Sequence, residues 1–353
     1  MTEPIRPKYP MGKVSRAFFE NVIAYHLGAR RKDVAVGPAN GVDIGVVRLP
    51  DGGALLSTTD PIYIVPQFGW ERAAWFAFHI LASDLATSGV APQYITMDWN
   101  LPMDIEDDQI ARMLQIIDRE SKKYGAAIVT GHTGRYEGCA YPMVGGATFL
   151  AVAPKEGWVT ANMARPGNRL LVTKTAALEA TAILSNTFPE LAERNVGAEV
   201  TKQARALFES MSTVDDALAA ASVGLRGDGV WAMHDATEGG VRNAVWEMAQ
   251  ASGLGVDVDL AKVHVDPAVT QVSKVFGMDP LDAISEGTLL IAVARDAAAD
   301  VVARLKRKRI PATDIGAFSK KGQPCLDRGY PFRPANRDPF WIAFSRALAG
   351  EIT

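Results

Sequence analysis

Cysteine is scarce in this sequence. Only two cysteines, Cys139 and Cys325, occur among the 353 residues. Two thiols so far apart provide neither a disulfide framework nor the paired spacing of a thiolate metal site. We therefore expect a protein of the reducing cytoplasm. Cys139 stands close to the glycine-rich stretch at residues 131–134, a position compatible both with a reactive thiol and with a small buried apolar side chain.

Long apolar runs are also missing. The longest uncharged segment, from Gly138 to Pro154, is interrupted by Pro142, Gly145 and Gly146. It falls short of the roughly 20 apolar residues that a membrane-spanning helix needs. The first eight residues have no apolar core of the kind found in signal peptides. The sequence therefore predicts a soluble protein that does not enter a membrane.

The chain has no large excess of charge of either sign. It contains 37 Lys and Arg residues against 40 Asp and Glu residues, a formal net charge of −3. This balance gives no electrostatic reason to bind nucleic acid. The one basic cluster, Arg304 to Arg309, falls at the end of a predicted helix, where cations favour the helix dipole. A solvated helix end is the simpler interpretation of that cluster.

The common nucleotide-binding fingerprints are absent as well. There is no Gly-x-x-x-x-Gly-Lys-Ser/Thr loop, and no Gly-x-Gly-x-x-Gly follows a strand. The chain has instead the motif from His234 to Gly240, His-Asp-Ala-Thr-Glu-Gly-Gly. An apolar segment precedes it and a helical pattern follows, which predicts a strand, a glycine turn and a helix. Backbone N–H groups at such a turn, together with the helix dipole, favour an anion.

A second stretch follows the same logic about a hundred residues earlier. An apolar segment leads into Gly131-His132-Thr133-Gly134, which predicts another strand followed by a glycine turn. Arg135 comes next and offers a planar fork of donors suited to a phosphate or a carboxylate. The alternative is a surface arginine that pairs with a neighbouring acidic side chain. Two such turns that carry hydroxyl groups suggest an enzyme that handles phosphate.

Strand and helix patterns alternate along the whole chain. After a proline-rich, extended start at residues 1–12, strands are expected at 41–49, 54–59, 94–99, 126–130, 143–152, 169–173, 229–233, 256–258 and 288–294. Helices are expected at 14–25, 70–89, 105–124, 178–188, 198–211, 215–223, 241–248, from 266, at 297–308 and from 338. The alternation predicts an α/β or α+β protein. The length suits two domains, and we expect them at 1–157 and 165–335, followed by a helix at 336–353.

Three aspartates stand in otherwise apolar or small-residue surroundings. They are Asp43, Asp60 and Asp84. An unpaired buried carboxylate is costly, so each needs a cation or hydrogen-bond donors. Mg²⁺ bound to a nucleotide usually takes one or two carboxylates besides phosphate oxygens. The alternative is a capping or turn aspartate, for which Asp60 before Pro61 is the best candidate.

Other polar residues have the chemistry of a phosphate site. Lys13 suits a mobile cation over phosphates, or a solvated lysine at a helix start. His132 and Thr133 suit contacts with a nucleotide or metal, or hydrogen bonds within a turn. Thr237 suits a phosphate contact or a helix N-cap. Glu286, beside a glycine turn, suits a base or orienting group, or only a turn residue.

In combination, several segments resemble a known family. They occur in the family's order: Thr58–Pro61, Ser83–Gly89, Gly131–Thr133, His234–Gly240 and Asp279–Gly287. The sequence resembles the superfamily of aminoimidazole ribonucleotide (AIR) synthetase, selenophosphate synthetase, thiamine monophosphate kinase and the hydrogenase maturation protein HypE. The last two segments are most similar to the HypE-like branch.

This resemblance implies a two-domain AIR-synthase-like fold and a homodimer whose N-terminal sheets form a shared barrel. It also implies that ATP and Mg²⁺ bind there, and that the γ-phosphoryl group goes to an oxygen of a small molecule or of a partner's carboxamide. The residues it implies are metal ligands Asp43, Asp60 and Asp84, nucleotide-binding Lys13, Gly131, His132, Thr133, Gly239 and Gly240, and catalytic Asp235, Thr237 and Glu286. We add Arg135 to the catalytic candidates because of its own chemistry, since its planar fork of donors suits a phosphate or a carboxylate.

The sequence also departs from that family. HypE-like proteins carry an acidic or polar residue where Gly134 stands, and Arg135 adds a cation beside it. The chain ends Ala-Gly-Glu-Ile-Thr, without the cysteine tail that is modified in HypE, so we do not expect that self-modification. Our main hypothesis is an ATP- and Mg²⁺-dependent enzyme that activates an amide or carboxamide oxygen. The alternative is a nucleotide-binding accessory or sensor protein without turnover.

Overall fold

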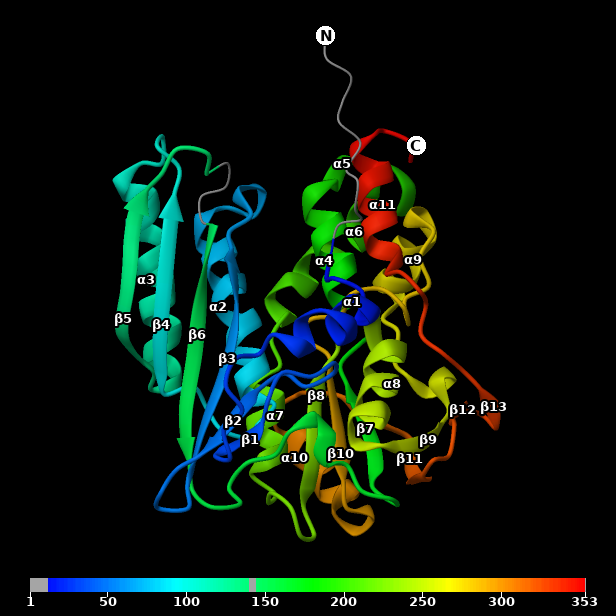
Figure 1. Ribbon diagram of the computed structural model, residues 1–353. Coiled ribbons are helices and arrows are strands. Elements are labelled where there is room, and N and C mark those ends of the chain that lie inside the picture. The colour runs from blue at the N-terminus through cyan, green and yellow to red at the C-terminus, as the bar shows by residue number, and fades with distance from the viewer. Residues whose placement is uncertain (1–11, 140–143, 353) are drawn as a thin grey trace.

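The computed structural model describes residues 12–139 and 144–352. Two β-sheets stand beside one another, and helices cover one face of the first sheet and both faces of the second (Figure 1). The predicted extended start lies, except for Gly12, outside the described residues. Within the described ranges, no helix combines the length and the apolar character needed to cross a lipid bilayer.

The first sheet has six strands in the order β1-β2-β3-β6-β4-β5. The bounds of its strands are β1 Val34–Val36, β2 Gly45–Arg48, β3 Ala54–Tyr63, β4 Tyr94–Leu101, β5 Ala127–Arg135 and β6 Val144–Ala153. β4 and β5 are parallel, and the other neighbouring pairs are antiparallel. Helices α2 (Trp70–Ala86) and α3 (Asp107–Tyr124) pack against one face of this sheet.

Local sequence explains these elements. In β4 every second residue, from Ile95 to Leu101, is buried in the core that contains α2 and α3. Such alternation is typical of a strand with one covered face. α3 begins after a capping box in which Glu106 and Gln109 bond each other's backbone N–H groups. It ends at Gly125, whose left-handed backbone suits a glycine C-cap.

The predicted glycine turn at residues 131–134 is wrong. The strand expected at 126–130 continues through that stretch as β5, which pairs in parallel with β4 as far as Arg135. Gly131 is needed there because a Cβ atom would come within 2.4 Å of the Met97 carbonyl oxygen. The glycine therefore reflects a close approach of two strands and not a turn.

The second sheet has seven strands in the order β13-β12-β9-β11-β7-β10-β8. Their bounds are β7 Arg169–Thr173, β8 Val230–Asp235, β9 Leu254–Val258, β10 Leu289–Val293, β11 Ala312–Lys321, β12 Cys325–Asp327 and β13 Tyr330–Pro331. Only β12 and β9 are parallel among the paired strands of this sheet that the structure describes. The predicted α/β (α+β) class is confirmed by this arrangement.

The remaining helices surround the second sheet (Figure 1). Their bounds are α1 Arg16–Asn21, α4 Leu178–Thr187, α5 Pro189–Val196, α6 Ala198–Ala206, α7 Val214–Ala221, α8 Gly240–Ser252, α9 Pro267–Phe276, α10 Ala298–Arg307 and α11 Pro339–Leu348. β10 is buried at all of its positions. Leu289, Ile291 and Val293 face the core with α7 and α10, whereas Leu290 and Ala292 face the core with α8. Helices on both faces explain this uninterrupted apolar strand.

Helix α2 connects the two halves of the molecule. Its His79 Nδ1 lies 2.7 Å from Ser212 Oγ, and its Ser83 Oγ accepts the N–H of Thr213 at 3.0 Å. Ser212 and Thr213 immediately precede α7, which packs under the second sheet. The next residue on α2 is Asp84. These contacts therefore fix the position of Asp84 relative to the second sheet.

Each sheet draws its strands from one side of the segment 157–165, where we divide the chain. The exact domain boundaries remain a prediction. The expected helix at 14–25 is shorter in the structure, where α1 ends at Asn21 and a 3₁₀ turn follows. β11 and α5 were not predicted, and β11 is the longest strand of its sheet.

Two adjacent glycines in β6 allow a test of this packing. A Cβ atom on Gly145 would lie 2.0 Å from the Asp98 carbonyl oxygen, whereas one on Gly146 would meet nothing closer than 3.4 Å. We expect Gly145→Ala to lower the free energy of unfolding by about 2 kcal/mol, as in other overpacked sites, and the melting temperature by roughly 5 °C. Thermal unfolding followed by circular dichroism would measure this. Gly146→Ala is the control, and equal melting temperatures would contradict the predicted clash.

Candidate active site

Acidic side chains from both sheets meet where the two halves of the molecule face each other. Asp43 lies in the loop before β2, Asp60 on β3 and Asp84 on α2. Asp235 ends β8, and Glu286 lies in the loop before β10. Their charges act on one another's pKa values, which places them within electrostatic reach. We call these residues the carboxylate cluster. The structure thus brings together acidic residues that the sequence analysis selected separately.

Asp235 is the most deeply buried member of the carboxylate cluster. Its side chain is almost fully enclosed, with a relative exposure of 1%. Neither of its carboxylate oxygens has a hydrogen-bond partner among the described residues. Burial, and then the charge of Asp43, raise the pKa of Asp235 to about 7. Because a buried unpaired carboxylate is costly, this position calls for a cation.

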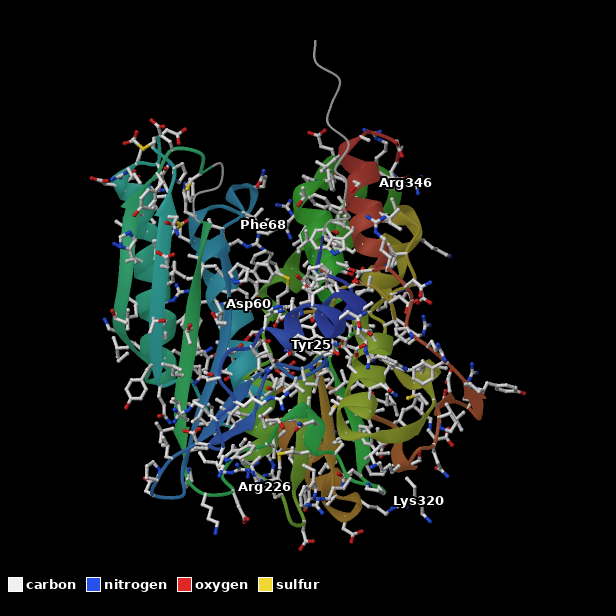
Figure 2. All side chains as sticks on the ribbon, viewed as in Figure 1. Tyr25, Asp60, Phe68, Arg226, Lys320 and Arg346 are labelled. Atoms are coloured by element: carbon white, nitrogen blue, oxygen red, sulfur yellow. The ribbon has the colours of Figure 1, made fainter. Side chains whose placement is uncertain are left out.

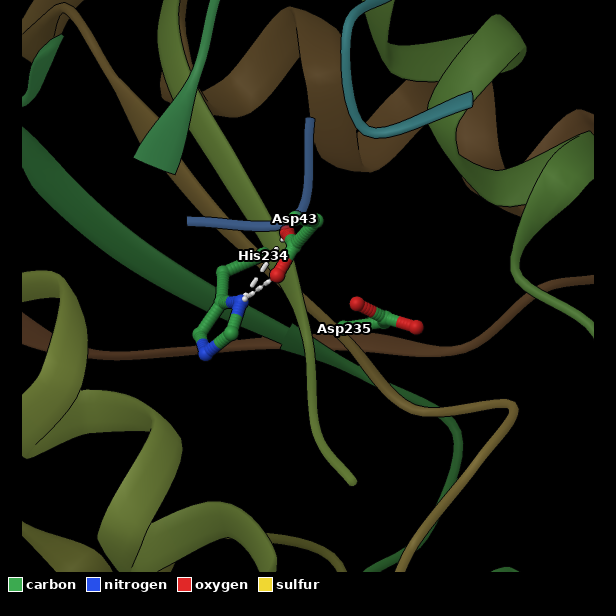
Figure 3. Close-up of side chains that lie close together, drawn as sticks. All are labelled: Asp43, His234 and Asp235. Carbon is green, nitrogen blue, oxygen red and sulfur yellow. Dashed lines mark hydrogen bonds and ion pairs between the residues drawn. The ribbon is translucent and has the colours of Figure 1, made fainter. Parts of the chain in front are cut away.

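His234 compensates part of this negative charge. Its Nδ1 lies 2.8 Å from Asp43 Oδ1 (Figure 3). Its Nε2 lies 3.1 Å from Glu247 Oε2 on α8. Burial opposes protonation, but Asp43 and Glu247 together raise the pKa of His234 well above its usual value. A protonated imidazole therefore donates to both carboxylates, which fixes the orientation of Asp43.

Asp84 and Asp60 extend the carboxylate cluster toward the first sheet. Thr58 Oγ1 on β3 donates to Asp84 Oδ2 at 3.0 Å. Burial, with contributions from Asp235 and Asp43, raises the pKa of Asp84 well above its usual value. Asp60 sits within β3 opposite Ala147, beside α2 in Figure 2, and not in a turn. The turn interpretation of Asp60 is therefore wrong, because the strand continues through Pro61.

Glu286 and Glu179 form the side of the carboxylate cluster next to α4. Glu286 is buried, and its Oε1 has no partner within the described ranges. Its backbone N–H donates to Glu179 Oε2 at 3.0 Å. Burial, followed by Asp235 and Glu179, raises the pKa of Glu286 well above its usual value. Burial likewise raises the pKa of Glu179 to about 7.

The chemistry of the carboxylate cluster fits a divalent cation. Asp43, His234 and Asp235 each offer one ligand atom, and these atoms all lie within 4.8 Å of one another (Figure 3). Since His234 already binds two carboxylates, the oxygen atoms of Asp43 and Asp235 are the better donors for a hard cation such as Mg²⁺. Asp235, which we expected to be catalytic, is therefore also a candidate metal ligand.

Lys13 lies at the edge of the carboxylate cluster. Its Nζ donates to Thr237 Oγ1 at 3.3 Å. Although burial opposes its charge, Asp84 and then Asp60 raise the pKa of Lys13 above its usual value. The backbone N–H of Lys13 donates to both carboxylate oxygens of Glu238, at 3.0 and 2.9 Å. The predicted lysine therefore stays charged and is held beside the turn that follows Asp235.

The turn between β8 and α8 contains two glycines with left-handed backbones. Gly239 is the N-cap of α8, so Thr237 does not cap the helix. At Gly240 a Cβ atom would lie 2.6 Å from the Ala283 carbonyl oxygen, which excludes larger residues. The N–H of Gly239 donates to Asp338 Oδ2 at 2.7 Å, and that of Gly240 donates to the Thr237 carbonyl oxygen. Both donors already have protein acceptors, and their assignment to a nucleotide stays a prediction.

The predicted residues of β5 lie away from the carboxylate cluster. Within one chain, β6 and β4 separate β5 from β3. His132 Nε2 lies 2.6 Å from the hydroxyl of Tyr136, and Arg135 forms a 2.6 Å ion pair with Asp107. Gly131 and Thr133 belong to the same edge strand. The structure therefore does not unite these residues with Asp235, and their roles stay predictions.

Sequence analysis missed Glu179 and Glu247 and gave no role to His234. Glu247 meets His234 because α8 folds back along β8, and Glu179 meets Glu286 because α4 begins beside the loop before β10. Neither contact leaves a signal in residue spacing. His234 stands inside the glycine motif, and its position directly before Asp235 was the one available indication.

Comparison with solved structures supports this architecture. A structure described as AaThiL complexed with AMPPCP and TMP matches with a TM-score of 0.68 and 20% identity, over 90% of this chain and 94% of that chain. A hydrogenase maturation protein HypE in complex with ATP matches with a TM-score of 0.62 and 21% identity, over 88% of each chain. At this level of identity the likeness establishes the fold.

Sequence comparison establishes the family. The N-terminal domain of AIR synthase related proteins matches residues 41–152, and the C-terminal domain matches residues 165–325. The carbamoyl dehydratase HypE of Escherichia coli K12 is 30% identical over 259 residues, which cover 72% of each chain. The protein therefore belongs to the AIR synthase related family and, within it, to the HypE-like branch.

Proposed function

We propose that this protein binds Mg²⁺ and ATP at the carboxylate cluster and activates an amide or carboxamide oxygen by phosphoryl transfer. The observation that carries the proposal is Asp235, whose two buried oxygens have no partner among the described residues. The similarity to a carbamoyl dehydratase and to a HypE structure with bound ATP supports the same chemistry. The acceptor is a small molecule or a carboxamide on a partner protein.

The residues of the carboxylate cluster divide the work as follows. Asp43, Asp84 and Asp235 would hold Mg²⁺, which supplies positive charge to the phosphates when bound. Asp60 lies beside Asp84 and strengthens the negative field that attracts the ion. Lys13 brings a permanent positive charge to the same place and adds to the neutralisation of the transferring group.

The transfer itself needs positioning more than covalent chemistry. The acceptor oxygen bonds to the γ-phosphorus while the bond to the β–γ bridging oxygen breaks, and ADP leaves. Thr237, which Lys13 holds by a hydrogen bond, is placed to orient the transferred group. Glu286 belongs to the carboxylate cluster, its Oε1 has no partner among the described residues, and it is our candidate for orienting the acceptor.

The metal assignment can be tested by removing single charges. Asp84→Asn and Asp235→Asn should each weaken Mg²⁺-dependent ATP binding by about tenfold or more, because a hard cation loses a charged ligand. Asp60→Asn should also weaken Mg²⁺-dependent ATP binding. Isothermal titration calorimetry with and without Mg²⁺ measures it, and Asp118→Asn, an exposed residue paired with Lys122, is the control. Unchanged affinity in the first two variants would refute the assignment, and binding without ADP release would favour an accessory role.

The second part of the proposal is that the protein forms a homodimer. β5 exposes apolar residues at the edge of the first sheet, among them Ile128 and Val129 with 47% and 54% of their surface accessible. An open apolar edge strand favours pairing with another chain. We infer that two copies meet through this edge, which would carry His132, Thr133 and Arg135 toward the partner's nucleotide.

Assembly is checked by sedimentation velocity. The wild-type protein should sediment as a dimer at micromolar concentration, and Val129→Glu should shift it toward the monomer because a buried unpaired charge is costly. Leu348→Glu, at an exposed position on α11, is the matched control. A specific interface of typical affinity should form at tens of micromolar. A wild-type protein that is monomeric at this concentration would therefore contradict the proposed dimer.

Arg135 gives an independent test of the role of β5. If it binds a phosphate or carboxylate, Arg135→Lys should impair ATP affinity or turnover nearly as much as Arg135→Ala, because the planar fork of donors is lost in both. If Arg135 forms only a surface ion pair with Asp107, the free energy of ATP binding in both variants should stay within about 1 kcal/mol of the wild-type value. Steady-state turnover or calorimetry distinguishes the two, with Arg112→Ala as the control for a surface arginine.

A further inference from the structure

A cavity of about 640 Å³ opens beside the carboxylate cluster. It lies between the N-terminal segment at residues 13–20, one side of α8 from Asn243 to Ala251, and the segment that leads into α11. This volume falls in the range of small-molecule sites. Thr237 and Lys13 line it, and both also belong to the edge of the carboxylate cluster. A ligand in the cavity would therefore reach the place where the proposed phosphoryl transfer occurs.

Flat side chains form part of the cavity wall. Trp246 on α8 is partly exposed, and the guanidinium of Arg16 lies 4.8 Å from its ring centroid. Trp341, at the start of α11, is fixed by a 3.0 Å hydrogen bond from its Nε1 to Glu238 Oε1. Rings held in this way favour a planar ligand, which can stack on them at a low entropic cost.

The charges of the wall are largely compensated by the protein itself. Arg16 pairs with Glu20, and Glu247 pairs with His234. Glu238 accepts the N–H groups of Lys13 and Trp341, and Asp338 accepts two backbone N–H groups. The cations of the wall, Lys13, Arg16 and Arg337, are all exposed. They stand against four carboxylates, those of Glu20, Glu238, Glu247 and Asp338, so the balance of charge disfavours a phosphate dianion.

The polar groups that remain are mostly carboxamides. Asn40, Asn243, Gln250 and Asn336 line the cavity. A carboxamide offers both donors and an acceptor, although that of Asn243 already donates to the Glu238 carbonyl oxygen at 2.9 Å. A ligand that itself carries a donor beside an acceptor, such as an amide, lactam or urea, matches such a wall, and a purely anionic ligand does not.

From these observations we propose that the cavity binds the acceptor substrate, and that this acceptor is a neutral, planar molecule with a carboxamide or lactam group. The inference deepens the proposed function, on which it rests, by naming the substrate class. It separates this protein from a kinase whose acceptor already carries a phosphate. The acceptor oxygen would lie at the end of the cavity that Lys13 and Thr237 line.

Binding of simple probes tests the proposal without requiring turnover. Nicotinamide and inosine are neutral, planar and carry a carboxamide or lactam, and inosine monophosphate adds a phosphate to the same ring system. We expect saturation-transfer NMR to detect both neutral probes at millimolar concentration, and inosine monophosphate to bind at least about fivefold more weakly than inosine. Failure of both neutral probes to bind, or tighter binding of inosine monophosphate, would overturn the proposal.

Variants locate the probe in the cavity. Trp246→Leu and Gln250→Ala should each weaken inosine binding by about threefold or more, through lost stacking and a lost hydrogen bond. Trp231→Leu is the matched control, since Arg165 stacks on Trp231 at 3.9 Å outside the cavity. Gln271→Ala, on the exposed side of α9, controls for Gln250. Unchanged inosine affinity in both cavity variants would show that inosine does not bind in this cavity. Because Gln250 is exposed, Gln250→Ala should fold and keeps the test valid even if Trp246→Leu does not fold.

The same variants separate this inference from the proposed function. Mg²⁺-dependent ATP binding should survive Trp246→Leu and Gln250→Ala, because neither residue belongs to the carboxylate cluster. ATP that displaces inosine competitively would identify the cavity as the nucleotide site and overturn the inference, whereas the proposed function would stand. Inosine binding in a protein that does not bind Mg²⁺ and ATP would support the cavity and refute the proposed function.

Discussion

The crowding of buried carboxylates at the meeting of the two sheets is the constraint on which the site depends. Asp43 and Asp84 come from the N-terminal half, whereas Asp235 and Glu286 come from the C-terminal half. Like charges that share a poorly solvated space repel one another, and burial adds to the cost of each charge. His234 and Lys13 offset part of this negative charge. The remaining negative charge is the basis of the metal site that we propose, and its burial lowers the stability of the ion-free protein.

The surrounding structure resists the separation that this repulsion favours. β8, which ends at Asp235, and β10, which follows Glu286, are covered by helices on both faces. α2 carries Asp84 and is bonded through His79 and Ser83 to the segment before α7. Such a frame holds the acidic groups at fixed positions, which would lower the reorganisation needed for the proposed phosphoryl transfer.

The sequence predicted the elements whose periodicity is strong and the residues that lie within recognisable motifs. α3 and β10 were expected within a few residues of their observed bounds, and Asp43, Asp84 and Asp235 were selected before their proximity was known. β11 was not predicted because Gly316 and charged residues interrupt its alternation of apolar and polar residues. The pairing of Glu247 with His234 was not predicted either, since it depends on how α8 folds back along β8. The glycine turn at 131–134 failed because a glycine needed for close strand packing has the same sequence signature as one needed for a turn.

Glu238 joins the two ends of the described chain. Its carboxylate binds the backbone of Lys13 near one end and the indole of Trp341 near the other, and Gly12 packs so closely that a Cβ atom would lie 2.7 Å from Trp341 Nε1. During synthesis, the segment around Lys13 therefore cannot adopt its final position until α11 has been made. The cavity wall, and the lysine it places beside the carboxylates, is complete only after α11 has been synthesised. A chain that lacks α11 consequently lacks part of this wall even after both sheets have folded.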